Sequence, residues 1–298
     1  RLVSAAILVT SLVTLLWLDY HQVLFHRPGV WLLPVACGFV SLAVLEMFDL
    51  FHAQSWQPRR GMTLLGTLAP ILAATIPQLW TNYPANCPVG RLGWPMLAIG
   101  LSVTWVFAGE MARYREPGRT TVHVALSLLT ILYLGGLGSF LVQLRLFHDN
   151  RWGLAALVSL IIVVKMCDTG AYFAGRFLGR HKMSPVLSPK KTIEGAVGGI
   201  VASIVSAGIW IAWIVPNFLI TDAPAVAPWR WAAYGLLLAV AGMIGDLAES
   251  LLKRDAGAKD ASHRLPGMGG ILDVLDSLLL AAPVAYACWV RGLIGPGG

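Results

Sequence analysis

A cluster of charged side chains lies near the C-terminal end of an otherwise apolar chain. Residues 245–279 read GDLAESLLKRDAGAKDASHRLPGMGGILDVLDSLL and contain ten charged residues, although only 12% of the chain is charged. Asp246 and Glu249 are three residues apart, as are Asp273 and Asp276, so each pair shares one helix face. Such carboxylates repel one another unless cations compensate them. Oxygen ligands beside phosphates favour Mg²⁺, which takes one or two protein carboxylates together with substrate phosphates.

Basic and glycine-rich residues between the two acid pairs add the features of a polyphosphate site. The turn that ends in Gly269 and Gly270 lets the backbone approach a ligand closely. Intramembrane acids also serve as ion relays in transporters or pair with local bases. Basic residues on the same side of the membrane would repel a cation, so phosphate chemistry is favoured over transport. The basic residues of this stretch are Lys253, Arg254, Lys259 and Arg264.

Two upstream stretches bring further charge toward the same end. In VVKMCDTGAYFAGR, Lys165 and Asp168 share a helix face, either as an ion pair that fixes helix packing or in a polar cavity open to the cytoplasm. In HKMSPVLSPKKTIEGAVGG, lysines and hydroxyls precede a helix start, where free N–H groups attract anions. An ordinary basic loop is the alternative, and the glycines follow the lysines, unlike those of a Walker loop. The candidate phosphate-binding residues here are Ser188, Lys190, Lys191, Thr192 and Glu194.

The composition predicts the elements that must position these residues. The chain of 298 residues is 57% hydrophobic, with a mean hydropathy of +0.70. Apolar stretches near the bilayer-spanning length of ~20 residues recur along it. We therefore expect an all-α integral membrane protein with about nine transmembrane helices, since in lipid each segment must satisfy its own backbone hydrogen bonds. The expected spans are 2–18, 30–48, 62–80, 93–112, 122–144, 153–175, 194–215, 231–252 and 271–292.

The first span and the charge distribution set the expected orientation. Residues 2–18 lack the basic leader and small-residue cleavage site of a signal peptide, so they are interpreted as a span. Most of the 22 Lys and Arg residues fall in loops on the same side of the membrane as the N-terminus. The N-terminus and the charged site are therefore expected to face the cytoplasm, in the cytoplasmic membrane of the cell. The net charge of +7 then reflects a basic membrane face, and no nucleic-acid partner is expected.

The two halves of the chain differ in polarity. Residues 1–150 are interpreted as an N-terminal scaffold of five spans, in which Glu46 and Glu110 are the intramembrane charges. Residues 151–298 are interpreted as a C-terminal catalytic half of four spans, and we expect it to be continuous with the scaffold as one membrane domain. Four scattered cysteines predict neither a disulfide framework nor a zinc site. Close helix packing is expected along the small residues Gly195, Gly198, Gly199, Ala202 and Ser203.

With these residues in view, the chain resembles the bacterial phosphatidate cytidylyltransferases, also called CDP-diacylglycerol synthases. The family pattern is S-x-x-K-R-x(4)-K-D, then P-G-H-G-G, then D-R-x-D. The resemblance covers about residues 150–285, and the first half is similar only in its spans. The matching residues are Ser250, Lys253-Arg254, Lys259-Asp260, Pro266-Gly267, Gly269-Gly270, Asp273 and Asp276, with Asp168–Tyr172, Ser188–Thr192 and Glu194-Gly195 upstream.

The resemblance implies transfer of CMP from CTP to phosphatidate, which gives CDP-diacylglycerol and pyrophosphate. It implies Mg²⁺ held by Asp246, Asp273 and Asp276, membrane lipids as surroundings, and a homodimer. Lys253 and Arg254 are expected to act with the metal-binding acids in catalysis. A phosphomonoester is already largely dianionic near pH 7, so its oxygen can attack without a Ser or His nucleophile. The residues expected to bind substrate are Asp168, Ser188, Lys190, Lys191, Thr192, Glu194, Ser250, Lys259, Asp260, Arg264, Gly269 and Gly270.

Two positions depart from the family pattern. Met268 stands where the family has His, and Val274 stands where it has Arg. Methionine cannot donate to a phosphate oxygen and valine carries no charge, while Arg264 could replace part of the lost charge. The alternatives are therefore a transferase that acts on another lipid phosphate, such as an isoprenoid one, and a family member with weakened activity. An ion-coupled transporter is disfavoured.

Overall fold

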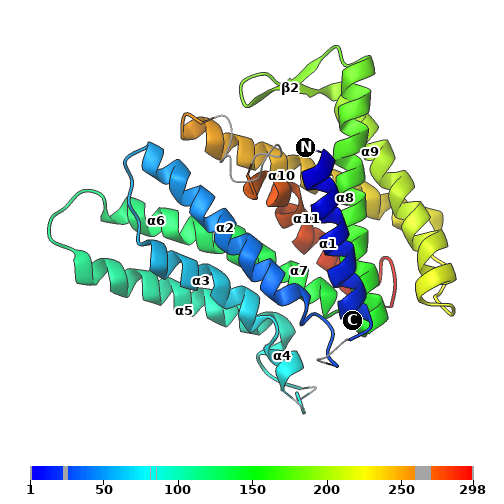
Figure 1. Cartoon of the computed structure of the whole chain (residues 1–298), viewed down its shortest axis with the longest axis horizontal. Coiled ribbons are helices and arrows are strands. Elements are labelled where there is room, and N and C mark those ends of the chain that lie inside the picture. Colours follow the sequence, from blue (N-terminus) through cyan, green and yellow to red (C-terminus); the bar gives the residue numbers. More distant parts are fainter. Residues whose placement is uncertain (1, 23–25, 81, 85, 259–269, 297–298) are drawn as a thin grey trace. The chain divides into compact units, whose positions relative to one another are not determined.

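The structure, a computed structural model, describes residues 2–22, 26–80, 82–84, 86–258 and 270–296, and for residues 2–9 it describes the backbone alone. The chain forms two compact units. Unit 1 comprises Arg1–Leu146 and Asp255–Asp273, and unit 2 comprises Phe147–Arg254 and Val274–Gly298. Each unit is built almost entirely of helices (Figure 1).

Unit 1 packs its helices around an apolar core. Helix α3 contacts both α2 and α5, and α5 contacts α6. Val44, Met47 and Phe48 of α2 are almost completely buried, with Ile71 of α3. The helices are α1 (Leu2–Tyr20), α2 (Leu32–Ala53), α3 (Arg60–Ala73), α4 (Ile76–Leu79), α5 (Gly90–Arg113), α6 (Thr120–Thr130), the π-helical segment η1 (Ile131–Gly136) and α7 (Leu137–Arg145).

Unit 2 consists of four long helical segments and one β-hairpin. Asp149 begins α8, because its side chain accepts hydrogen bonds from the N–H groups of Arg151 and Trp152. The antiparallel strands β1 and β2 pair Ser184 with Ser188. The elements are α8 (Asn150–Leu178), β1 (Lys182–Ser184), β2 (Ser188–Thr192), α9 (Ile193–Gly208), the π-helical segment η2 (Ile209–Leu219), α10 (Pro228–Asp255) and α11 (Leu272–Val290), which starts in unit 1.

The helices confirm the expected class of all-α membrane protein. Among the described residues, seven helical segments are long and apolar enough to cross a membrane: α2, α5, α6 through α7, α8, α9 with η2, α10 and α11. Large apolar side chains point outward, such as Leu101, which is 71% exposed. The expected spans 2–18 and 62–80 overlap α1, a helix of 19 residues, and α3, a helix of 14 residues, and these two helices are not among the seven.

The β-hairpin is the one departure from a purely helical chain among the described residues. The sequence predicts no strand between the expected spans 153–175 and 194–215, and the structure corrects this with two short paired strands. The strands are three and five residues long, and they contain Lys, Ser and Pro without alternating apolar residues. They therefore lack the period of two that predicts a strand.

Small residues bring α8 and α9 close together, as expected from the run that begins at Gly195. The two helices run side by side in Figure 1 and make extensive contact. A Cβ atom at Gly198 would lie 2.2 Å from the Cβ of Ala174, and one at Gly170 would lie 2.5 Å from the Cβ of Ala202. Since both distances are far below van der Waals contact, the prediction of close packing is confirmed.

Replacing Gly198 with Val is expected to lower the free energy of unfolding. The added atoms would overlap Ala174, and overpacking of this kind costs about 1–3 kcal/mol or more. A thermal unfolding assay in detergent should show a lower Tm for Gly198→Val. The control is Gly100→Val, because no atom lies within 4 Å of a Cβ at Gly100. Equal Tm values for the two variants would contradict the packing described here.

Candidate functional site

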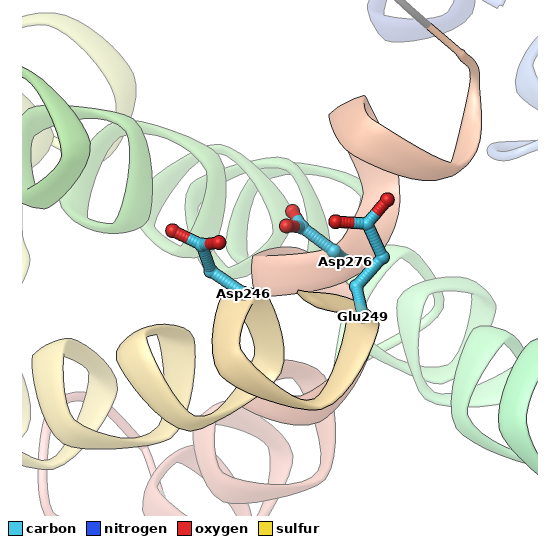
Figure 2. A group of neighbouring side chains, drawn as sticks. All are labelled: Asp246, Glu249 and Asp276. Atoms are coloured by element: carbon cyan, nitrogen blue, oxygen red, sulfur yellow. The ribbon is translucent and has the colours of Figure 1, made fainter. Parts of the chain in front are cut away.

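Three carboxylates from two helices of unit 2 converge in one place. Asp246 and Glu249 lie on α10, and Asp276 lies on α11 (Figure 2). Each can offer a carboxylate oxygen, and these three oxygens lie within 4.8 Å of one another. Glu249 and Asp276 are buried, whereas Asp246 is partly exposed. The spacing of three residues in the sequence thus places Asp246 and Glu249 on the same face of α10, toward Asp276.

A close approach of α10 and α11 brings the acids together. A Cβ atom at Gly245 would lie 2.5 Å from the backbone oxygen of Asp276. Glycine at this position therefore allows the backbone of α11 to approach α10 directly beside Asp246. A larger residue at 245 would separate the carboxylates.

Cationic and polar groups compensate the three acids. The Nζ atom of Lys191 lies 2.6 Å from Oδ2 of Asp246, and Nζ of Lys253 lies 2.7 Å from Oε2 of Glu249. The Ser277 hydroxyl donates a hydrogen bond of 2.9 Å to Oδ1 of Asp276. Lys253 is buried together with Glu249. The cluster therefore contains both the acids that can bind a cation and bases that can bind an anion.

Asp168 and Lys165 extend this cluster along α8. The Nζ atom of Lys165 lies 3.2 Å from Oδ2 of Asp168, and both side chains are partly exposed. Asp168 also interacts electrostatically with Asp246 and Lys191. The expected ion pair is thus present, and its acid belongs to the same polar region as the group of three carboxylates.

The hairpin and the start of α9 hold the upstream candidates. Ser188, Lys190, Lys191 and Thr192 all lie on β2. Lys190 is exposed, whereas Lys191 contacts the acidic cluster. The Thr192 hydroxyl accepts a hydrogen bond of 3.1 Å from the N–H of Gly195, so Thr192 caps α9.

Hydrogen bonds join Glu194 to the segment between α8 and β1. Its carboxylate accepts hydrogen bonds from the backbone N–H groups of Arg180 and His181. Its Oε1 atom also lies 2.6 Å from Nδ1 of His181. These contacts give Glu194 a role in fixing the hairpin beside α9, in addition to the substrate-binding role expected for it.

The remaining candidates of α10 point in two directions. Ser250 is buried within α10. Arg254 donates a hydrogen bond of 3.3 Å from Nε to the carbonyl oxygen of Leu187, in the turn of the hairpin. Arg254 and Lys191 therefore both connect the hairpin to α10, the former through the turn and the latter through Asp246.

In unit 1, Asp273 and Gly270 lie at the start of α11. The N–H of Gly270 donates a hydrogen bond of 2.6 Å to Oδ2 of Asp273. Asp273 is not in the group of three carboxylates that the described residues form; Glu249, which was left out of the predicted metal ligands, takes part instead. The three-residue spacing from Asp246 was the signal that could have identified Glu249.

Several predicted residues lie outside the described part of the chain: Lys259, Asp260, Arg264, Met268 and Gly269. Val274, the second departure from the family pattern, is half-buried on α11.

The donor set suits a hard divalent cation. Mg²⁺ and Ca²⁺ bind oxygen ligands, and Mg²⁺ is commonly bound through one or two carboxylates plus phosphate oxygens. Asp246 and Asp276 supply such carboxylates from two different helices, with Glu249 beside them. Lys191 lies where it can contact an anion that shares the cation. The residues present therefore fit a magnesium–phosphate site.

Comparison with known proteins gives consistent results. The model of the cytidylyltransferase family matches residues 1–290. A phosphatidate cytidylyltransferase of Synechocystis is 31% identical over 286 residues, which is 87% of this chain and 88% of the relative. The protein of that name from Bacillus subtilis is 37% identical over 85% of this chain and 88% of the relative. The one from Brucella suis is 41% identical over 52% of this chain and 54% of the relative.

Proposed function

The chain belongs to the cytidylyltransferase family, and from this premise we propose that it transfers CMP from CTP to phosphatidate, giving CDP-diacylglycerol and pyrophosphate. Two relatives that it matches over most of their length bear the name of this activity. The observation that carries the proposal is the convergence of Asp246, Glu249 and Asp276 beside Lys191. Carboxylates beside a basic residue suit a polyphosphate bound together with Mg²⁺.

We propose that Asp246, Asp273 and Asp276 hold Mg²⁺, with Glu249 beside them. Magnesium bound there would polarise the α-phosphate of CTP and offset charge on the departing pyrophosphate. The phosphate oxygen of phosphatidate attacks the α-phosphorus, the bond to the β-phosphate oxygen breaks, and pyrophosphate leaves. Because the attacking oxygen already carries negative charge, the protein mainly has to align the reactants and neutralise charge.

Basic residues near the acids are proposed to hold the phosphates. Lys191 is already beside Asp246, and Lys253 is beside Glu249. Arg254 lies on α10 and Lys190 lies on β2 of the hairpin, and the hydrogen bond of Arg254 to Leu187 connects these two elements. The described polar surroundings also include Ser188, Thr192, Ser250 and Asp168. We propose that the substrate site is completed by Lys259, Asp260, Arg264, Gly269 and Gly270.

Lys191 should contribute mainly to CTP binding. Replacing it with Gln removes a charged hydrogen-bond donor, which is worth about 1.5–3 kcal/mol. The KM for CTP is therefore expected to rise by about 10-fold or more, since 1.4 kcal/mol corresponds to a factor of ten. Steady-state kinetics of Lys191→Gln test this prediction, with Lys182→Gln on the neighbouring strand β1 as the control. An unchanged KM for CTP would rule out a phosphate contact by Lys191.

The orientation and assembly of the protein are also proposals. We place the site at the cytoplasmic boundary of the membrane, with the N-terminus in the cytoplasm and nine spans in total. Helix α8 is long enough to extend beyond the hydrocarbon core, because its 29 residues span about 43 Å, more than the ~30 Å thickness of that core. Asp168 lies in the C-terminal half of this helix, ten residues before its end at Leu178. A homodimer is proposed from the family resemblance, and light scattering of the detergent-solubilised protein would test it.

Radiolabelled CTP identifies the lipid acceptor. Purified protein is incubated with CTP labelled in the cytosine ring, magnesium and either phosphatidate or an isoprenyl phosphate, and the lipids are then extracted. We expect label in the lipid fraction when phosphatidate is the acceptor, and none when the isoprenyl phosphate is the acceptor. Label with the isoprenyl phosphate alone would show a sister transferase. No lipid label with either acceptor would contradict the proposed reaction.

A further inference from the structure

A buried glutamate of the N-terminal scaffold holds the start of the helix that carries Asp273. Glu46 lies on α2 and is 0% exposed. Its Oε1 atom accepts a hydrogen bond of 3.0 Å from the N–H of Ile271, and its Oε2 atom accepts one of 2.8 Å from the N–H of Leu272. All of these residues belong to unit 1. One side chain thus satisfies two backbone donors more than 220 positions away in the chain.

These donors are groups that a helix leaves without an internal partner. The first N–H groups of a helix have no carbonyl acceptor within that helix, and a carboxylate there is also stabilised by the helix dipole. The third N–H of this turn, that of Gly270, is bound by Asp273. Glu46 and Asp273 therefore both accept hydrogen bonds from backbone N–H groups at the start of α11.

The contact leaves no room for a side chain at Gly270. A Cβ atom there would lie 2.5 Å from Oε2 of Glu46 and 2.9 Å from its carboxyl carbon. A side chain at 270 would therefore displace the Glu46 carboxylate, which provides a second way to disturb the same contact.

From these contacts we propose that Glu46 is a positioning residue for the metal-binding acids: it fixes the first turn of α11 and thereby the direction of the Asp273 carboxylate. The inference rests on the proposed function of Asp273 and adds to it a task for the N-terminal half. Glu46 acts through the helix start, by its hydrogen bonds to Ile271 and Leu272. Its amide counterpart would present an NH₂ group to one of the two N–H donors, so it can accept from only one of them.

The test measures backbone order and metal binding separately. Hydrogen exchange of the amides of residues 270–276, followed by mass spectrometry without metal or substrate, reports whether the helix start is held. Binding of Mn²⁺, followed by electron paramagnetic resonance without substrate, reports the metal site. Glu46→Gln and Gly270→Ala are compared with Glu110→Gln, which removes another buried carboxylate of unit 1, one that lies near His123.

We expect both Glu46→Gln and Gly270→Ala to accelerate exchange at the start of α11 and to weaken Mn²⁺ binding by about tenfold, the lower end of the effect of groups that orient metal ligands. Glu110→Gln should leave both values near those of the unaltered protein. Faster exchange with unchanged Mn²⁺ affinity would overturn the inference and leave Glu46 a purely structural residue. Loss of Mn²⁺ binding in all three variants alike would also overturn it. If the unaltered protein binds no Mn²⁺, the proposed metal site fails and the inference fails with it.

Discussion

Replacing Asp246 with Asn lowers the rate of CMP transfer by at least about 100-fold, the upper end of the effect expected for residues that only orient metal ligands. The carboxylate lies in the group of three acids and 2.6 Å from Lys191. The amide is a neutral and weaker ligand, and it leaves the Lys191 ammonium without its anionic partner. The measurement is the initial rate with CTP, phosphatidate and magnesium, together with Mn²⁺ binding to the protein alone.

The control for this substitution is Asp222→Asn. Asp222 is exposed in the loop that follows η2 and is not in the carboxylate cluster. The Asp222→Asn substitution removes the same charge from the chain without changing the proposed site. An Asp246→Asn protein that retains both Mn²⁺ affinity and activity would contradict the assignment of this acid to the metal.

Asp273→Asn is expected to lose activity to a similar extent while the fold is kept. The amide oxygen of Asn can still accept the hydrogen bond from the Gly270 N–H, so this contact at the start of α11 is kept. The negative charge proposed to bind the metal is lost. We therefore expect activity to fall about 100-fold or more, beyond the effect of a residue that only orients a ligand, with a Tm close to that of the unaltered protein.

The companion variant Asp273→Ala separates the two roles of this residue. Alanine removes the acceptor for Gly270 as well as the charge, and loss of such a hydrogen bond costs about 1 kcal/mol. Asp273→Ala should therefore be both inactive and less stable, whereas Asp273→Asn should be only inactive. If Asp273→Asn keeps full activity, Asp273 serves only to start α11, and Asp246, Glu249 and Asp276 are left as the metal-binding group.

The sequence predicted the class of the protein and the helix face that two of its acids share. Long apolar stretches predict membrane helices because the bilayer demands them. The spacing of Asp246 and Glu249 predicts a shared helix face, and the structure agrees. The small residues near Gly198 predict close helix packing, which the contacts to Ala174 confirm. Each of these predictions depends on local periodicity, which a sequence shows directly.

What the sequence did not predict depends on contacts between distant segments. Glu46 appeared only as an unusual charge in a span, because nothing near it indicates that it would meet Ile271 and Leu272. The hairpin was missed because its strands are short and lack alternating apolar residues. The sequence likewise did not show which of the four acids would converge. Residue spacing predicts which acids share a helix face, but the packing of α10 against α11 at Gly245 determines which faces meet.

The most direct test of the proposed function is the release of pyrophosphate from CTP by the purified protein, measured with and without phosphatidate over a range of magnesium concentrations. We predict release that requires both phosphatidate and magnesium, and that Asp246→Asn abolishes. Such a result would also show that Met268 and Val274 are compatible with turnover. Saturable binding of CTP without pyrophosphate release under any of these conditions would contradict the account.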